Sequence, residues 1–178
     1  IENRYIPSGP TVSDEIANMM FWVGVMVGRP KKYDNIHEKM NFKDAKSNFF
    51  NAARYGMSTQ FYWNNNYTTS HNLILDELLP MAYKGLYRLN VEPKDVEHYL
   101  KIIKNRVRSK TGSQWIIKNY RNLLESHKPF EAAQILTSIM YDKQQKDYPV
   151  SSWKSLRKDE NIQFKQQKLV KHKMSSDI

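Results

Sequence analysis

Helix start and stop signals recur along most of this 178-residue chain and constrain its fold more than any other feature. Thr11, followed three residues later by Asp14, forms a helix-capping pattern, and the apolar helix that begins there is predicted to end at Gly28, before Pro30. Apolar residues recur at helical spacing in the later segments 41–56, 70–89, 92–107, 111–126 and 129–146. The chain is therefore predicted to be mainly α-helical, as a bundle of about six helices.

One small β-hairpin is predicted between the second and third of these helices. Residues 59–63 and 67–69 are rich in β-formers, and they flank a run of asparagines at 64–66 that tolerates the positive φ angles of a tight turn. In the helix that follows, Pro80 cannot donate a backbone hydrogen bond, so we expect it to bend the helix axis.

Composition excludes several classes of protein. The hydrophobic fraction of 40%, with 11 Tyr, 7 Phe and 4 Trp, suits a globular core and argues against a disordered chain. The absence of cysteine excludes disulfides and thiolate metal sites, and it fits a cytoplasmic protein. The longest apolar run, 19–27, is shorter than the ~20 residues that cross a bilayer, so no membrane partner is expected.

Positive charge is unevenly distributed along the chain. The 28 lysines and arginines exceed the 18 acidic residues, and the resulting net charge of +10 favours anionic partners. Residues 101–128 hold eight Lys or Arg and one acid. From residue 154 onward the chain carries seven Lys or Arg, three acids and few large apolar side chains. We therefore predict one folded domain over 1–153 and a basic, flexible tail over 154–178.

The amino-terminal residues place a carboxylate and a guanidinium two positions apart. On a β-strand, residues i and i+2 share a face, so Glu2 and Arg4 would project together. An acid beside an arginine suits a site for a metal ion and a phosphate group, because the carboxylate binds a hard cation and the guanidinium binds phosphate oxygens. A plain ion pair on the surface of a strand would show the same pattern.

The segment that contains this pair resembles the glutamate-cysteine ligase family and its carboxylate-amine ligase relatives. Glu2-Asn3-Arg4 leads through a Pro/Gly turn into residues 11–18, and the resemblance continues through residues 51–57, 75–82 and 108–115, over most of 1–153. The chain looks like the carboxy-terminal portion of such an enzyme, with Glu2 and Arg4 on a strand remnant of a larger catalytic sheet. Its start at Ile1, without a methionine or a signal peptide, also suits a fragment. Asn3 departs from the pattern, because a buried strand is usually apolar at that position.

The resemblance implies an ATP-dependent reaction that needs Mg²⁺. In this family a glutamate side-chain carboxylate takes the γ-phosphoryl group of ATP, and an amine then displaces phosphate to form an amide. Glu2 would ligate the metal, and Arg4 would be a catalytic, ATP-binding residue that contacts the transferring phosphate. The partners of the intact enzyme would be a nucleotide and an amino-acid-like carboxylate. This chain alone is expected to be inactive, because one strand cannot supply every metal-ligating acid.

Two further segments are candidates for ATP binding. The family match suggests a nucleotide or substrate contact for Arg54, although a cation near a helix end also complements the helix dipole. A predicted helix start could hold an anion between its free N–H groups, and ordinary helix capping is the alternative interpretation. This helix start comprises Thr111, Gly112, Ser113 and Gln114. The cations expected around it are Arg106, Arg108 and Lys110.

A basic helical binding module is the alternative function. Residues 101–128 and the lysine-rich tail would then bind nucleic acid or an acidic protein, and binding to a polyanion would be weak and without sequence preference. The sequence contains no helix-turn-helix or RNA-binding signature. A phosphate-binding enzyme is also basic, so charge alone does not separate the two functions.

Overall fold

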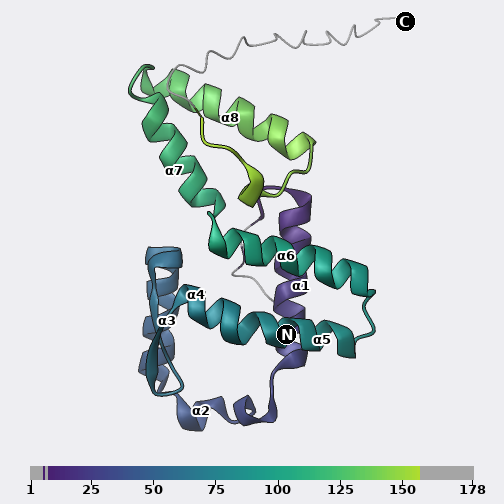
Figure 1. The fold of residues 1–178 in the computed structure, drawn as a ribbon. Helices are drawn as coiled ribbons and strands as arrows, with labels where there is room; N and C mark the ends of the chain where they lie inside the picture. The colour runs from purple at the N-terminus through teal and green to yellow at the C-terminus, as the bar shows by residue number, and fades with distance from the viewer. Residues whose placement is uncertain (1–5, 7, 157–178) are drawn as a thin grey trace, which may run out of the picture.

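The computed structural model describes residue 6 and residues 8–156. This part of the chain is mainly helical and contains a two-stranded antiparallel hairpin, which confirms the predicted fold class (Figure 1). The helices are α1 (Val12–Gly28), α2 (Ile36–Lys39), α3 (Phe42–Tyr55), α4 (Ser70–Asn72), α5 (Leu79–Arg88), α6 (Pro93–Arg108), α7 (Gly112–Leu123) and α8 (Pro129–Gln145). The strands are β1 (Gln60–Trp63) and β2 (Asn66–Thr69).

Short helical segments connect these elements. Three of them are 3₁₀ turns, η1 (Lys31–Tyr33), η2 (Gly56–Ser58) and η4 (Val150–Ser152), and η3 (Leu73–Leu78) is a π-helix. No helix among the described residues is long and apolar enough to cross a membrane. The predicted strand with Glu2 and Arg4 lies outside the described residues, as does the predicted tail beyond residue 156.

The first hydrophobic core lies where α1 crosses α5 and α6 (Figure 1). Glycines let the backbones of α1 and α5 touch, because a Cβ atom at Gly85 would lie 1.9 Å from the carbonyl oxygen of Gly24. A Cβ atom at Gly28 would lie 1.8 Å from that of Met81. The buried side chains around this crossing include Ala17, Met20, Leu79, Ala82, Leu86, Val96, Leu100 and Ile103. One side of α1 is therefore held by direct backbone contact.

A π-helical segment comes just before Pro80, where the sequence predicts a bend of the helix axis. Residues 70–88 run as α4, η3 and α5 without a break, and Pro80 is the second residue of α5. Proline removes one backbone donor, and its ring clashes with the carbonyl four residues back. The wider π turn changes the register just before the proline, so that the Leu79 N–H donates to the carbonyl of Ile74, five residues back.

A second hydrophobic core joins α7, α8 and the chain that follows them. The indole rings of Trp115 and Trp153 meet edge to face, with centroids 5.0 Å apart and planes at 83°. Asn119 is fully buried. Its Nδ2 donates to the Trp115 carbonyl (2.6 Å), and its Oδ1 accepts from the N–H of Leu156, the last described residue (2.6 Å). Packed contacts thus reach Leu156, beyond residue 154, where the sequence predicts that the tail begins.

Asp14 connects the two cores. Its carboxylate is fully buried, and Oδ1 lies 2.6 Å from Nη2 of Arg106 on α6. The other oxygen, Oδ2, accepts hydrogen bonds from the backbone N–H of Val150 (2.9 Å) and from the hydroxyl of Thr11 (3.0 Å). The predicted capping by Thr11 is also present, since its hydroxyl accepts from the Asp14 N–H at 3.1 Å.

A second carboxylate, that of Asp147, forms hydrogen bonds between the chain after α8 and the same end of α1. Asp147 accepts from the hydroxyl of Ser13 (2.6 Å) and from its backbone N–H (2.9 Å). These two bonds, led by the one from the hydroxyl, hold the pKa of Asp147 below its ordinary value, because they favour the charged form.

The hairpin forms as predicted. Trp63 pairs with Asn66, and Asn64 and Asn65 occupy the turn with φ angles of 50° and 64°. Glu77 of the π-helix ties the hairpin to the rest of the fold, because one of its oxygens accepts both from the Trp63 indole (3.2 Å) and from the hydroxyl of Tyr33 (2.7 Å).

Candidate functional site

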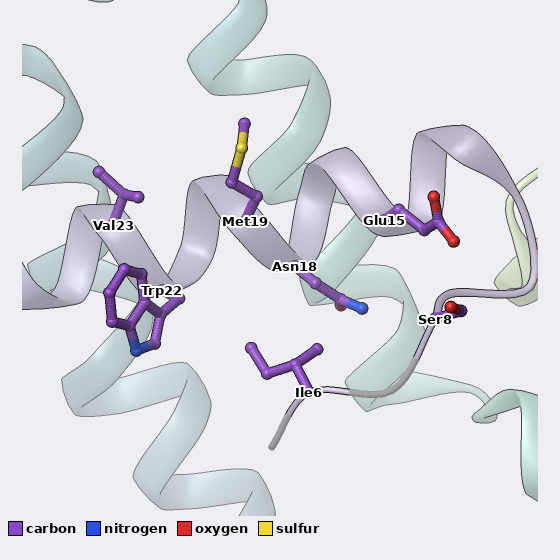
Figure 2. A pocket seen from close by; sticks show the side chains of 7 residues that line it. All are labelled: Ile6, Ser8, Glu15, Asn18, Met19, Trp22 and Val23. Carbon is purple, nitrogen blue, oxygen red and sulfur yellow. The ribbon is translucent and has the colours of Figure 1, made fainter. Parts of the chain in front are cut away.

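A pocket of about 410 Å³ lies between the amino-terminal segment and one face of α1 (Figure 2). The five helical residues that line it follow one another at spacings of three, one, three and one, which places them on a single face of the helix. The lining residues are Ile6, Ser8, Glu15, Asn18, Met19, Trp22 and Val23. The same periodicity that turns Ala17 and Met20 toward α5 and α6 therefore turns these side chains toward Ile6 and Ser8.

The pocket has a polar end and an apolar end. Figure 2 shows Glu15 and Ser8 at one end, Trp22 and Val23 at the other, and Asn18 between them. Met19 on the apolar part is 56% exposed, so its side chain is accessible to a ligand. The arrangement suits a small ligand that carries polar groups at one end and an apolar group at the other.

Asn18 is oriented by the buried ion pair behind it. Its Oδ1 accepts from Nη1 of Arg106 at 2.5 Å, while the same guanidinium binds Asp14. With the oxygen held on that side, the Nδ2 atom points toward the segment that carries Ser8 (Figure 2). The polar end of the pocket therefore offers an amide donor, a hydroxyl and the carboxylate of Glu15.

The predicted helix start at Thr111 is a reciprocal capping box. The Thr111 hydroxyl accepts from the Gln114 N–H (3.3 Å), and the Gln114 side-chain oxygen accepts from the Thr111 N–H (2.8 Å). Ser113 is exposed, and a Cβ atom at Gly112 would lie 2.9 Å from Cγ of Pro10. The structure thus brings this helix start against the segment that leads from the amino terminus into the pocket.

Two of the three cations expected around this helix start have partners inside the protein. Arg106 points into the fold toward Asp14 and Asn18, and Lys110 donates to the carbonyl of Ser151 at 3.1 Å. Arg108 is exposed. The sequence shows that Arg106 is close to Arg108, but it does not show that Arg106 points into the protein. That orientation depends on the buried carboxylate of Asp14.

Arg54 lies away from the pocket lining. It occupies the last turn of α3 and is exposed, with its guanidinium carbon 6.0 Å from the ring centroid of Tyr55. Its position at the helix end fits the dipole interpretation, and its role in nucleotide binding stays a prediction.

Sequence reasoning missed the residues of α1 that line the pocket. Glu15, Asn18 and Trp22 were assigned only to a helix, although their spacing puts two polar groups and one indole on the same face. That spacing, read directly after the Glu2 and Arg4 segment, is the signal that would have found them.

Residue 6 and residues 8–156 contain no group of three or more His, Asp or Glu placed to hold a metal ion. Glu2, the predicted metal ligand, lies outside this range, as does Arg4.

Comparison of the chain with protein-family models, with curated proteins and with solved structures found no match.

Proposed function

We propose that this chain is the helical, carboxy-terminal part of a glutamate-cysteine-ligase-like, ATP-dependent carboxylate-amine ligase. The observation that carries the proposal is that Glu2 and Arg4 precede the pocket-lining residue Ile6 by only four and two positions in the sequence. In any conformation, a residue two positions before Ile6 is within about 7 Å of it, and one four positions before is within about 14 Å. This short separation along the chain supports the proposal that Glu2 and Arg4 act on a ligand bound in the pocket.

The polar end of the pocket suits an amino-acid-like substrate. The Asn18 amide, whose oxygen is held by Arg106, would donate to a carboxylate oxygen. Glu15 would accept from an ammonium group. The indole of Trp22 and the side chain of Met19 would cover the apolar part of the same molecule.

The reaction proposed for the intact protein has two steps. A substrate carboxylate oxygen attacks the γ-phosphorus of ATP, and ADP leaves with the electron pair of the broken P–O bond. The amine nitrogen then attacks the acyl carbon, phosphate leaves, and the nitrogen loses a proton. Glu2 would be one of the residues that hold Mg²⁺, which when bound would supply neutralisation of the phosphate charge. Arg4 would contact the transferring group.

Replacing Glu2 with glutamine or Arg4 with lysine should stop the reaction without unfolding the intact ligase. Glu2→Gln removes charge from the metal site while keeping shape, and Arg4→Lys keeps charge while losing the two-pronged guanidinium. We expect phosphate release with ATP, glutamate and an amine to fall at least about 100-fold, because positioned charges on a transferring phosphoryl group contribute that much or more. Melting temperatures should stay unchanged, since an exposed ion pair contributes under about 1 kcal/mol.

The control for this pair is Glu131→Gln, which removes an exposed acid in the first turn of α8 and should leave turnover unchanged. The isolated 178-residue chain should release no phosphate. Turnover at the level of the unmodified ligase in both Glu2→Gln and Arg4→Lys would reject the assigned roles and leave the pair as an ordinary ion pair.

A second candidate function, weak polyanion binding, is favoured by the exposed face of α6. Lys94, Lys101 and Arg108 are exposed and follow one another every seven residues, so they lie along one side of the helix. This row would track a phosphate backbone without reading its sequence.

Binding to nucleic acid through this row should weaken steeply with salt. Three phosphate contacts predict a slope of about −2.7 in a plot of log affinity against log salt, so affinity should fall about 40-fold between roughly 50 and 200 mM salt. Two unrelated duplexes should bind equally, and Lys101→Ala should reduce the slope by about 1. Titrations by fluorescence anisotropy measure all three quantities. Salt-resistant binding that prefers one duplex would instead favour a sequence-specific nucleic-acid-binding function over the ligase.

A further inference from the structure

α3 presents its polar side to the protein and its apolar side to solvent. On the inner side, Asn48 donates to the carbonyl of Tyr62 (2.8 Å) and accepts from the N–H of the same residue (3.0 Å). The backbone carbonyl of Asn51 accepts from the hydroxyl of Thr59 at 2.9 Å. Every residue of α3 lies within the described part of the chain, and none of them is buried. This orientation is the reverse of the usual one for an amphipathic helix.

The outer side carries a continuous row of mostly apolar side chains. Phe42 is 81% exposed and Phe50 is 58% exposed. The rings of Phe49 and Phe50 meet edge to face, with their centroids 5.9 Å apart. The row consists of Phe42, Lys46, Phe49, Phe50 and Ala53, which follow the helical spacing i, i+4, i+7, i+8 and i+11. We name these five residues the aromatic stripe. Exposed apolar patches of this kind mark protein interaction sites.

The charges beside the aromatic stripe are positive. Lys43 lies on its exposed flank, and the ammonium group of Lys46, which belongs to the stripe, lies 6.0 Å from the ring centroid of Phe50. Arg54 extends this flank toward the end of the helix. The acid of α3, Asp44, comes two residues after Phe42 and so falls on the far side of the helix.

These positive charges distinguish between the kinds of partner that could bind to the aromatic stripe. A second copy of the chain would bring the same basic flank against the first, and like charges at an interface are repelled. A polyanion would satisfy the lysines but would leave the phenylalanines without an apolar partner. An acidic amphipathic helix satisfies both, because its apolar side chains cover the rings while its carboxylates pair with Lys43 and Lys46.

We propose that the aromatic stripe of α3 docks an acidic amphipathic helix of a partner protein. Apolar side chains at i, i+3, i+4 and i+7 of the partner lie on Phe42, Phe50 and Ala53, and Asp or Glu residues beside them face Lys43 and Lys46. This inference is independent of the ligase chemistry, because the residues it uses do not line the pocket on α1.

The test uses the full 178-residue chain and two synthetic 18-residue peptides. Both peptides carry leucines in the i, i+3, i+4, i+7 pattern, and the flanking positions are glutamate in one and lysine in the other. The glutamate peptide is expected to bind at least 10-fold more tightly by fluorescence anisotropy. Phe42→Ser combined with Phe50→Ser should weaken it at least 10-fold without changing the melting temperature, because both rings are exposed. Lys43→Glu combined with Lys46→Glu should reverse the preference between the peptides.

Phe130→Ser is the matched control, because this phenylalanine on α8 is 75% exposed and lies outside the aromatic stripe. It should leave peptide binding unchanged. Equal binding of the two peptides, or an equal loss in Phe130→Ser, would overturn the proposal. It would also be overturned if Phe42→Ser abolished a dimer seen by sedimentation, which would assign the stripe to a second copy. Loss of duplex binding in the lysine variants, with peptide binding intact, would assign the flank to polyanions and likewise reject the docked helix.

Discussion

Replacing Asp14 with alanine is expected to lower the free energy of unfolding by about 3 to 5 kcal/mol. The carboxylate is fully buried and is the ion-pair partner of Arg106, whose side chain is only 15% exposed. Removing it leaves a guanidinium without its counter-charge inside the protein, and the N–H of Val150 also loses its acceptor. Chemical denaturation of the 178-residue chain, followed by circular dichroism, measures this loss.

A double variant separates the ion pair from the packing around it. In Asp14→Leu combined with Arg106→Met no charge stays buried, so the loss should be smaller than the sum of the two single losses. Glu15→Ala is the control, because this neighbouring acid is exposed and should cost under about 0.5 kcal/mol. A loss in Asp14→Ala no larger than in Glu15→Ala would show that Asp14 does not hold the two cores together.

Trp115→Ala is expected to destabilise the second core by about 3 to 5 kcal/mol. This aromatic residue belongs to the second core and is 1% exposed. The variant removes the edge-to-face contact with Trp153 and the hydrogen bond from the indole to the carbonyl of Lys154 (2.9 Å). Thermal and urea denaturation would measure the loss.

Two further variants in α7 test whether the loss of stability in Trp115→Ala comes from the buried ring and its indole hydrogen bond. Trp115→Phe keeps an aromatic ring but loses the indole donor, so we expect a smaller loss of about 1 to 2 kcal/mol. Ile117→Ala changes an exposed residue of α7 and should cost under about 1 kcal/mol. An unchanged melting temperature in Trp115→Ala together with lost ligand binding would contradict the structural role and identify Trp115 as a binding residue.

Local signals in the sequence were sufficient to predict where most elements begin and end. Thr11 and Asp14 mark the start of α1, Asn64 and Asn65 mark the hairpin turn, and Pro93 marks the start of α6. Each of these signals acts on backbone groups a few residues away, so it can be read without knowledge of the fold. The same holds for the Thr111 helix start, whose capping interpretation the structure supports.

The candidate site was less accessible to sequence reasoning. Glu15, Asn18 and Trp22 share a face of α1, but nothing local shows that Ile6 and Ser8 lie against that face and help to form a pocket there. Arg106 sits in a basic segment and was expected to attract anions from solvent. It turns inward because the buried carboxylate of Asp14, far away in the chain, stabilises it there.

The sequence by itself determined the helical class, the hairpin and the positive charge of this protein, because these depend on short-range propensity and on composition. Only the tertiary structure decided which faces those helices bury. Glycines at 24, 28 and 85 let α1 and α5 meet at backbone distance, and hydrogen bonds from Asn48 turn α3 so that its phenylalanines face solvent. The physical reason is that helical periodicity identifies an apolar face, whereas the partner of that face is set by contacts between segments far apart in the chain.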